Sequence, residues 1–334
     1  MLDIFRDDMF GVVSLTNSIN KLPYVPQRIG AMGLFGTKGV PHTTIVIEER
    51  HGKLSIIPTS ARGGPGHMLG GTARRGKAVA IPHIKQVGAV MADDVQGVRA
   101  FDSEDATETV AQVVNDKLAE MRQNIEVTHE WHRIGALKGV VLDADGSTEI
   151  VNWYDEFDIT PEDMSFDFTA GDDVKLKANA ITRHMQDALG MTPMRGVHAF
   201  CGSAFYDELV TCDEVKGAFD RWQDGQFLRD SQARSSFEYA GIVWEEYRGS
   251  VGNIDFIDEN QARFFPTGVP DLFQVAFGPA DYVETVNTIG KPVYAKQEQM
   301  KFDRGVDMES QSNPLFICTR PAALVMGWDE ATGS

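Results

Sequence analysis

A single uninterrupted helical pattern near the middle of the chain constrains the fold more than any other feature. From Ser103 to Lys138, apolar residues recur mostly every three or four positions, as on one face of an α-helix. The stripe consists of Val110, Val114, Leu118, Met121, Ile125, Trp131 and Ile134, with Thr128 in its gap. Ser103 fits an N-cap and Gly139 a C-terminal stop. A helix of about 35 residues is roughly 50 Å long, so the pattern predicts a spine in an elongated molecule.

The residues before this helix predict a β-ribbon with a glycine-rich loop. Two β-branched runs, at 43–49 and 53–58, flank the turn Arg50-His51-Gly52, which predicts a hairpin. In the loop that follows, at 60–76, five of the nine residues from 63 to 71 are glycine. A further strand is predicted at 77–82.

Three arginines stand out in that loop, because the chain as a whole is acidic. They are Arg62, Arg74 and Arg75. We expect them to form inter-subunit contacts with carboxylates of another copy, since such a loop gains little from its own subunit. The alternative is that the arginines only keep the loop soluble.

Residues 1–40 combine prolines and glycines with isolated apolar residues. This composition breaks helices and strands alike. Two interpretations remain open: an extended N-terminal arm that lies on a neighbouring surface, or an irregular terminus packed on its own domain.

The second half of the chain alternates short helices and strands. The predicted elements are a hairpin at 140–142 and 149–151, helices at 172–189 and 203–210, and strands at 196–200 and 242–247. This alternation indicates a mixed α+β or α/β domain. The apolar runs 314–319 and 322–326 are expected to return to a sheet beside the long helix.

The charge of the chain argues against nucleic-acid recognition. With 31 Lys and Arg against 49 Asp and Glu, the formal net charge is -18, whereas binding phosphates requires clustered cations. No apolar run reaches the roughly 18 residues of a membrane span, and the acidic stretch 1–8 does not fit a signal or transit peptide. We therefore expect a cytoplasmic protein with no membrane contact.

Cys201, Cys212 and Cys318 lack the spacing of a disulfide framework or zinc site.

Several short motifs resemble catalytic or binding sites, but none has the required context. The segment 71–78 nearly matches a phosphate-binding loop, but Ala78 replaces the hydroxyl residue and the surrounding residues predict a strand. His129 and His132 are three positions apart rather than four, so we interpret them as surface histidines. Ser203 lacks the glycine pattern of a nucleophile elbow and fits a helix N-cap. The sequence predicts no catalytic residue, cofactor or metal site, and hence no enzyme.

A resemblance to a known family covers nearly the whole chain. It is carried, in order, by the segments Leu15–Pro23, Arg62–Pro65, Gln96–Phe101, Thr128–Gly139, Asn287–Lys296 and Cys318–Leu324. With these segments the chain resembles the major capsid proteins of tailed bacteriophages, and most closely the lambda-type major capsid protein E family.

This resemblance implies the α+β fold of the HK97-like (Hong Kong 97-type) phage capsid proteins. The implied parts are an N-arm at 1–40, an E-loop hairpin at 41–92, a P-domain with a long spine helix at 93–171 and 286–334, and an A-domain at 172–285. It also implies a major capsid (head) protein that self-assembles, as hexamers and pentamers, into an icosahedral shell enclosing double-stranded DNA. The implied partners are further copies, scaffolding protein, portal and a decoration protein, and the implied location is the virion, assembled in the bacterial cytoplasm.

Two other functions remain open at this stage. An encapsulin-like compartment would use the same architecture around an enzyme cargo. A soluble α/β enzyme with an unrecognised site would show turnover and a small oligomer instead of shells.

Overall fold

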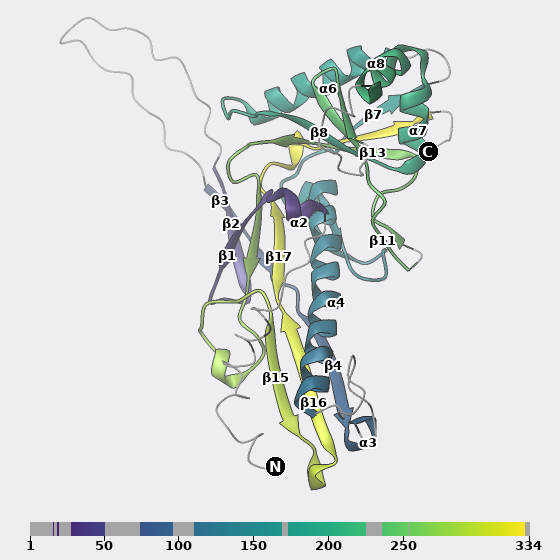
Figure 1. The fold of residues 1–334 in the computed structure, drawn as a ribbon. Helices are drawn as coiled ribbons and strands as arrows, with labels where there is room; N and C mark the ends of the chain where they lie inside the picture. The colour runs from purple at the N-terminus through teal and green to yellow at the C-terminus, as the bar shows by residue number, and fades with distance from the viewer. Residues whose placement is uncertain are drawn as a thin grey trace, which may run out of the picture.

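The predicted long helix is present and forms the axis of the molecule. A computed structural model describes residues 16, 19, 28–50, 74–95, 110–168, 173–224, 236–252 and 254–330. In it, helix α4 spans Val110–Lys138 and runs along an elongated body with a lobe at one end (Figure 1). The predicted N-cap, Ser103, lies outside the described residues.

The C-terminal end of α4 falls where the sequence predicts it. Gly139 has a φ of 82°, in the left-handed region that favours glycine. A methyl group at this position would lie 2.2 Å from the ring of Tyr154. Glycine is therefore required both for the backbone turn and for the close approach of the ring.

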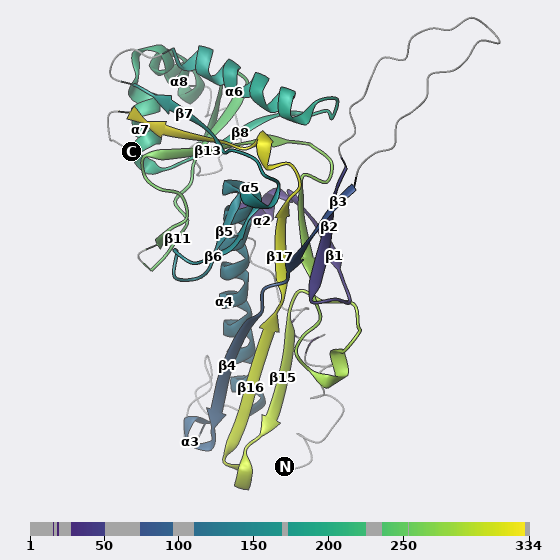
Figure 2. The ribbon, with the colours of Figure 1, turned by 180° about the vertical axis from the view of Figure 1, so that it is seen from behind.

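Two three-stranded sheets pack along α4, and together with the helix they form what we call the spine region (Figures 1 and 2). One has the antiparallel order β15-β16-β4, from Tyr294–Gln299, Gly305–Ser312 and Ile84–Met91. The other has the order β1-β14-β17, from Phe35–Gly39, Phe273–Phe277 and Pro314–Cys318. β1 pairs with β14 in parallel, so N-terminal and C-terminal segments share this sheet.

The apolar stripe of α4 packs on the first of these sheets. Val114, Leu118, Met121 and Ile125 are buried against a cluster that includes Met308 of β16. Thr128 does not continue the buried stripe, because it is only half-buried. The buried stripe continues instead through polar residues, among them His129 and His132.

The β-ribbon pairs differently from the predicted hairpin. β2 (Thr44–Arg50) pairs in antiparallel fashion with β3 (Arg74–Ala80), from Thr44 opposite Ala80 to Arg50 opposite Arg74. The prediction of 53–58 as the partner was therefore wrong, and those residues lie outside the described part of the chain. Val79 is buried and packs in one cluster with Ile45 and Ile47, which explains why β3 is the partner.

The lobe at the end of the spine region, which we call the upper lobe, contains a six-stranded sheet with the order β7-β18-β13-β8-β10-β9. The strands are Glu162–Phe166, Val325–Asp329, Gln261–Thr267, Gly196–Cys201, Ile242–Glu246 and Ser236–Tyr239. Helices α6 (Val174–Leu189), α7 (Ser203–Thr211) and α8 (Asp213–Asp224) lie on the side away from α4 (Figure 1).

Both faces of this sheet are buried, which explains the nearly continuous apolar sequence of β8. Val197 and Ala199 pack in the cluster that contains α6 and α7 residues, whereas Phe200 packs in the cluster shared with the spine region. β13 alternates in the same way, with Phe264 on one face and Phe265 on the other. The second face therefore joins the upper lobe to the end of α4.

The C-terminal prediction was half correct. β17 does lie beside α4, as expected for 314–319. The second apolar run, however, forms the short helix η5 (Pro321–Ala323) and then β18, which pairs with β7 and β13 in the upper lobe. The chain thus crosses from one region to the other within a few residues, and hydrophobicity alone does not reveal that crossing.

The remaining short elements complete the fold. They are α2 (Arg28–Met32), α3 (Ala92–Val95), β5 (Val140–Leu142), β6 (Glu149–Asn152), α5 (Trp153–Glu156), β11 (Ser250–Val251), β12 (Ile254–Asp255), η3 (Val283–Thr285) and η4 (Lys301–Asp303). The predicted hairpin after α4 is confirmed as β5–β6. Asp173 caps α6 by accepting a hydrogen bond from the Leu176 N–H, and Gly190 follows the helix with a φ of 60°.

Candidate functional site

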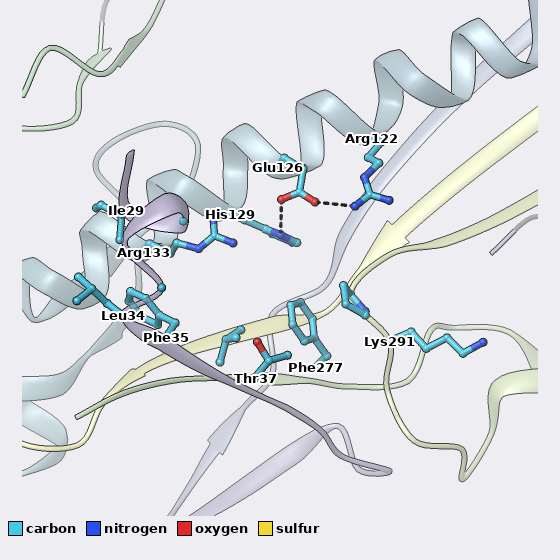
Figure 3. Close-up of a pocket in the computed structure, with 14 residues that line it drawn as sticks. Ile29, Leu34, Phe35, Thr37, Arg122, Glu126, His129, Arg133, Phe277 and Lys291 are labelled. Atoms are coloured by element: carbon cyan, nitrogen blue, oxygen red, sulfur yellow. Dashed lines mark hydrogen bonds and ion pairs between the residues drawn. The ribbon is translucent and has the colours of Figure 1, made fainter. Parts of the chain in front are cut away.

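A cavity of about 590 Å³ lies between α4, α2 and the sheet β1-β14-β17 (Figure 3). Apolar side chains, among them Leu34, Phe35 and Phe277, line it from the sheet side. α4 contributes charged and polar side chains, which are Arg122, Glu126, His129 and Arg133. The polar part of the spine helix therefore faces the molecule's interior at this point rather than solvent.

His129 links α4 to β16 and resembles part of a hydrolase triad. Its Nε2 is 2.8 Å from Ser312 Oγ, and its Nδ1 is 3.7 Å from a Glu126 carboxylate oxygen. Ser312 is fully buried, however, and its hydroxyl donates to the Pro292 carbonyl oxygen at 2.6 Å. Nε2 must then donate to Ser312 and cannot accept the serine proton, as a general base would. This arrangement is a structural cross-link, not a nucleophilic site.

The interpretation of His129 and His132 as surface histidines was wrong. Both are buried, and both rings pack against Phe316 of β17. Burial lowers the pKa of the His129 imidazole, and burial together with the nearby His129 lowers the pKa of His132 to about 4. The two imidazoles are therefore neutral at pH 7.

Glu130 of α4 holds the N-terminal helix α2 in place. Its carboxylate is fully buried and accepts hydrogen bonds from the backbone N–H groups of Ile29 (2.6 Å) and Gly30 (3.2 Å). The same carboxylate pairs with Arg133 at 3.2 Å. α2 is thus attached to the spine helix through its backbone.

Arg28 attaches the other side of α2 to the upper lobe. Its guanidinium donates two hydrogen bonds to the two carboxylate oxygens of Glu245 in β10, each at 2.5 Å. His198 of β8 lies 3.1 Å from the same carboxylate. Burial alone would raise the pKa of Glu245, but the hydrogen bonds from His198 and Arg28 outweigh it and lower the pKa to about 2. Through α2, a network of charged residues with buried carboxylates joins the spine region to the upper lobe.

Part of the predicted arm at 1–40 forms regular structure, because α2 and β1 lie within it, although its composition was expected to break helices and strands. Of the residues before α2, Thr16 and Ile19 are described, and both are buried against the spine region. The N–H of Ala295 in β15 donates to Thr16 Oγ1 at 3.2 Å. Arg122 of α4 donates to the carbonyl oxygen of Ile19, and it also contacts Glu126 at 3.4 Å. At these positions the N-terminal segment is attached to its own subunit.

A second hollow opens on the side of the spine region, and we call it the lateral groove. It has a volume of about 990 Å³ and lies between residues 41–46 at the start of β2 and the segment 278–287. Among its lining residues are three exposed valines: Val46, 62% exposed, Val283, 91% exposed, and Val286, 62% exposed. Single exposed apolar residues are common, but a group of them around a hollow indicates an interaction surface.

Two of the three predicted contact residues are described, and both lie at one end of the β-ribbon. Arg62 lies outside the described residues. Arg74 and Arg75 begin β3, where their backbones stand opposite Arg50 and Glu49. The inter-subunit role of these three arginines stays a prediction.

The rejected motifs occupy ordinary structural positions. Lys77 lies within β3, where its Nζ donates to the Asp155 carbonyl oxygen at 3.1 Å, so no helix N-terminus follows it to hold a phosphate. Ser203 is the first residue of α7, and Gly202 holds the N-cap position instead, so the prediction of Ser203 as the cap was wrong by one residue. All three cysteines are unbridged, and Cys201 and Cys318 are buried.

The described part of the chain shows no cluster of three or more His, Cys, Asp or Glu side chains arranged to hold a metal ion. Within the same residues, no helix combines the length and the apolar character needed to cross a membrane.

Comparison with known proteins identifies the family of the chain. The family model for phage major capsid protein E matches residues 11–327. The major capsid protein of Salmonella phage Felix O1 is 26% identical, with 97% of this chain and 98% of that protein covered. The major capsid protein of Pseudomonas phage KPP10 is 24% identical, with 95% and 96% covered.

A solved structure supports the same fold. The capsid asymmetric unit of cyanophage Pam1 is similar with a TM-score of 0.50 and 11% identity, over 88% of this chain and 86% of that one. The structure thus has the α+β, HK97-like phage capsid fold that the sequence resemblance implies. With the family model covering nearly its whole length, the chain belongs to the phage major capsid protein E family.

Proposed function

We propose that this major capsid protein assembles, as hexamers and pentamers, into the icosahedral shell of a tailed-phage head. The observation that carries this function is the family match over residues 11–327. The net charge of -18 supports a shell that encloses double-stranded DNA without binding its sequence, because an acidic protein repels the polyanion. The proposed partners are other copies of the chain, a scaffolding protein, a portal and a decoration protein, with assembly in the bacterial cytoplasm.

The proposed division of the subunit follows the family's parts. We assign an N-arm to 1–40, an E-loop to 41–92, a P-domain to 93–171 and 286–334, and an A-domain to 172–285. β7 and β18 fall within the two P-domain stretches but pair in the six-stranded sheet. The proposed A-domain therefore takes these two strands in addition to 172–285.

The function is tested by imaging and by the contents of the particles. Purified protein, with its scaffolding protein present, is expected to form closed shells in negative-stain images and to sediment as large particles. Particles isolated from infected cells are expected to contain genomic DNA. An enzyme cargo would favour a compartment shell instead, and a protein that stays monomeric under these conditions would overturn the proposal.

The three E-loop arginines are proposed to contact a neighbouring subunit. Exposed ion pairs each contribute about 0.2–1 kcal/mol, which becomes large only through repetition around a shell. Replacing Arg62, Arg74 and Arg75 by Gln should reduce shell formation most at low salt, and the difference from wild type should shrink at higher salt because salt screens exposed ion pairs. The unfolding temperature of the monomer should stay nearly unchanged.

A matched control removes three cations elsewhere. Lys175, Arg183 and Lys216 are exposed residues of the upper-lobe helices, and their replacement by Gln removes the same charge. We expect this control to assemble normally. If the loop variant assembled as well as the control at every salt concentration, the arginine contacts would be unnecessary.

A further inference from the structure

We propose that the cavity between α4, α2 and the sheet β1-β14-β17, which we call the spine cavity, binds a small amphipathic carboxylate of the fatty-acid class. The proposal goes beyond the capsid function and does not depend on it. It is argued from the size of the cavity, from the division of its lining into an apolar and a basic part, and from a buried arginine with an unused hydrogen-bond donor.

The spine cavity has the size and the lining of a small-molecule site. Its volume is about 590 Å³, within the range of about 300–1,000 Å³ that is usual for cavities that hold small ligands. Such sites are mostly apolar, with a few polar groups that fix the orientation of the ligand. Phe35 of β1 and Val275 and Phe277 of β14 line the cavity, and these two strands pair side by side. They form an apolar wall for a hydrocarbon chain.

The charge of the lining is reversed relative to the charge of the chain. Among the described lining residues, Arg122, Arg133 and Lys291 are basic, whereas Glu126 is acidic. Over the whole chain, acidic residues outnumber basic ones by 49 to 31. A basic lining attracts anions, so the ligand that fits this cavity combines a negative group with an apolar body.

Arg122 is the residue that binds the negative group. Its side chain is buried, with an exposure of 8% for the residue. The guanidinium donates to the Ile19 carbonyl oxygen and contacts Glu126 at 3.4 Å, which is long for a hydrogen bond. Within the part of the chain that the structure describes, the buried Nε of Arg122 has no acceptor. A buried donor without an acceptor is unfavourable, and a carboxylate oxygen supplies a charge-assisted hydrogen bond at this position.

The second arginine of the cavity is already paired, which fixes the orientation of the ligand. Arg133 pairs with Glu130 at 3.2 Å. Arg122 and Arg133 are eleven positions apart on α4, or about 16 Å along the helix axis, so the cavity is long enough for an extended molecule. Figure 3 shows Arg122 at one end of the cavity and Leu34 and Phe35 at the other. The carboxylate therefore lies at Arg122, and the hydrocarbon chain extends toward Leu34 and Phe35.

A ligand in the spine cavity contacts the N-terminal segment as well as the spine helix. Ile29 and Gly30 of α2 and Phe35 and Thr37 of β1 all line the cavity. A ligand that binds the folded chain but not the unfolded chain stabilises the folded chain. Binding would thus strengthen the attachment of α2 and β1 to α4.

Isothermal titration calorimetry of the purified full chain with octanoate tests the proposal. We expect one binding site per chain with a Kd below about 1 mM. Octanol lacks the charge and octylamine has the opposite charge, so each should bind about tenfold more weakly than octanoate, or more weakly still. The three compounds share the same hydrocarbon chain, so the comparison isolates the contribution of the carboxylate.

Two substitutions locate the binding site. Thr37 is an exposed residue of β1 that lines the cavity, so Thr37→Trp fills the cavity and should weaken octanoate binding about tenfold or more. Lys38→Trp is its matched control, because the next side chain of a strand points to the opposite face of the sheet. Arg122→Gln should weaken octanoate binding about tenfold but leave octanol binding unchanged. Arg183→Gln, at an exposed position of α6, is the control for Arg122→Gln.

The outcomes that would overturn the proposal are distinct. Octanoate that does not bind, or that binds wild type and Thr37→Trp equally, would exclude the spine cavity as its site. Equal affinities for octanoate and octanol would exclude a carboxylate site. The competing occupant is the segment 20–27 of the same chain, which leads from Ile19 to α2. Binding that appears only after Leu22, Tyr24 and Val25 are replaced by Ser would show that this segment fills the cavity, and would also overturn the proposal. Each of these results leaves the capsid function standing, because shell formation is measured separately.

Discussion

The upper lobe and the end of the spine region are built on different kinds of interior. The upper lobe has an apolar core with large aromatic side chains, in which Phe264 packs edge-on against Trp244 with ring centroids 5.2 Å apart. Next to it, α4, α2 and β10 meet in what we call the junction. The junction buries Glu130, Glu245, His129 and His132. The upper lobe is stabilised mainly by hydrophobic burial. The junction depends on buried polar and charged groups, each of which needs a hydrogen-bond or ion-pair partner.

This difference follows from how each region is covered. The six-stranded sheet is covered on one face by helices and on the other by the spine region, so apolar residues suffice (Figure 2). α4 is completed by pieces from distant parts of the chain, among them α2 and Ile19, which attach through backbone groups. Hydrogen bonds to Glu130 and Arg122 are directional, so they fix where these pieces lie. We infer that the apolar region supplies stability and the polar junction supplies position.

The largest expected effect comes from removing an aromatic ring of the upper lobe. Phe264→Ala leaves a cavity beside Trp244 and Phe166 and should lower the free energy of unfolding by about 3–5 kcal/mol. Chemical denaturation followed by tryptophan fluorescence measures it. Phe302→Ala is the control, because that ring is 87% exposed and its loss should have almost no effect. Equal effects from the two substitutions would contradict the apolar-core description.

The next effect tests the polar junction. Glu130→Ala leaves Arg133 and two backbone N–H groups of α2 without their buried acceptor, which should cost about 3 kcal/mol of unfolding free energy. Limited proteolysis should also cut the N-terminal segment faster, since α2 loses its attachment to α4. Glu120→Ala, on the exposed side of the same helix, is the control. A loss below 0.5 kcal/mol for Glu130→Ala, on the order of a surface change, would show that the junction does not depend on this carboxylate.

The two regions also differ in how far the sequence predicts them. Helices α4 and α6, with their terminal glycines, and the apolar strands β8 and β10 follow from periodicity and composition. The resemblance to capsid proteins supplies the fold. The pairing of β2 with β3 and the crossing of β18 into the upper lobe depend on long-range contacts that no local pattern encodes.

The sequence analysis did not predict the junction, and the reason lies in the spacing of its charged residues. Glu126 is three residues from His129, and Glu130 is three residues from Arg133, which is also the spacing of a solvated, salt-bridged helix face. Burial distinguishes the two cases, and burial is set by α2 and β17, which are distant in sequence. The signal that was available was the interruption of the apolar stripe at Thr128, where the stripe continues through His129 and His132.

The pH dependence of stability distinguishes the two regions, because His129 and His132 are buried at the junction. The folded pKa of His132 is lowered to about 4 from an unfolded value of 6.5, so between these values the unfolded chain binds the proton and the folded chain does not. Stability should therefore fall as pH drops through this window, by about 2 kcal/mol at pH 5. The lowered pKa of His129 acts in the same direction. The lowered pKa of Glu245 adds stability that is complete only above its unfolded pKa of 4.5 and is lost as pH falls from there to its folded pKa of about 2.

Denaturation at pH 7 and pH 5 measures this effect, with His132→Gln as the comparison. The variant has no proton to take up at this position, so its loss between the two pH values should be smaller by about 2 kcal/mol. His42→Gln, which removes an exposed histidine of the lateral groove, should keep the wild-type pH dependence. Identical pH profiles for wild type and His132→Gln would contradict the assignment of a neutral, buried imidazole.

The smallest expected effect compares two ion pairs on the same helix. Lys117 and Glu120 form an exposed pair at 2.7 Å, whereas Arg122 and Glu126 form a buried pair at 3.4 Å. In a double-mutant cycle with alanine, the exposed pair should show a coupling of no more than about 0.5 kcal/mol, because water screens it. The coupling of the buried pair should be larger, although its distance is longer, because Arg122 also holds the Ile19 carbonyl and Glu126 also lies beside His129. Repeating both cycles at high salt separates the causes: the exposed coupling should vanish while most of the buried coupling remains. If the shorter, exposed pair had the larger coupling, distance rather than burial would decide the strength of charge pairs along α4, and the contrast between the two regions would lose its physical basis.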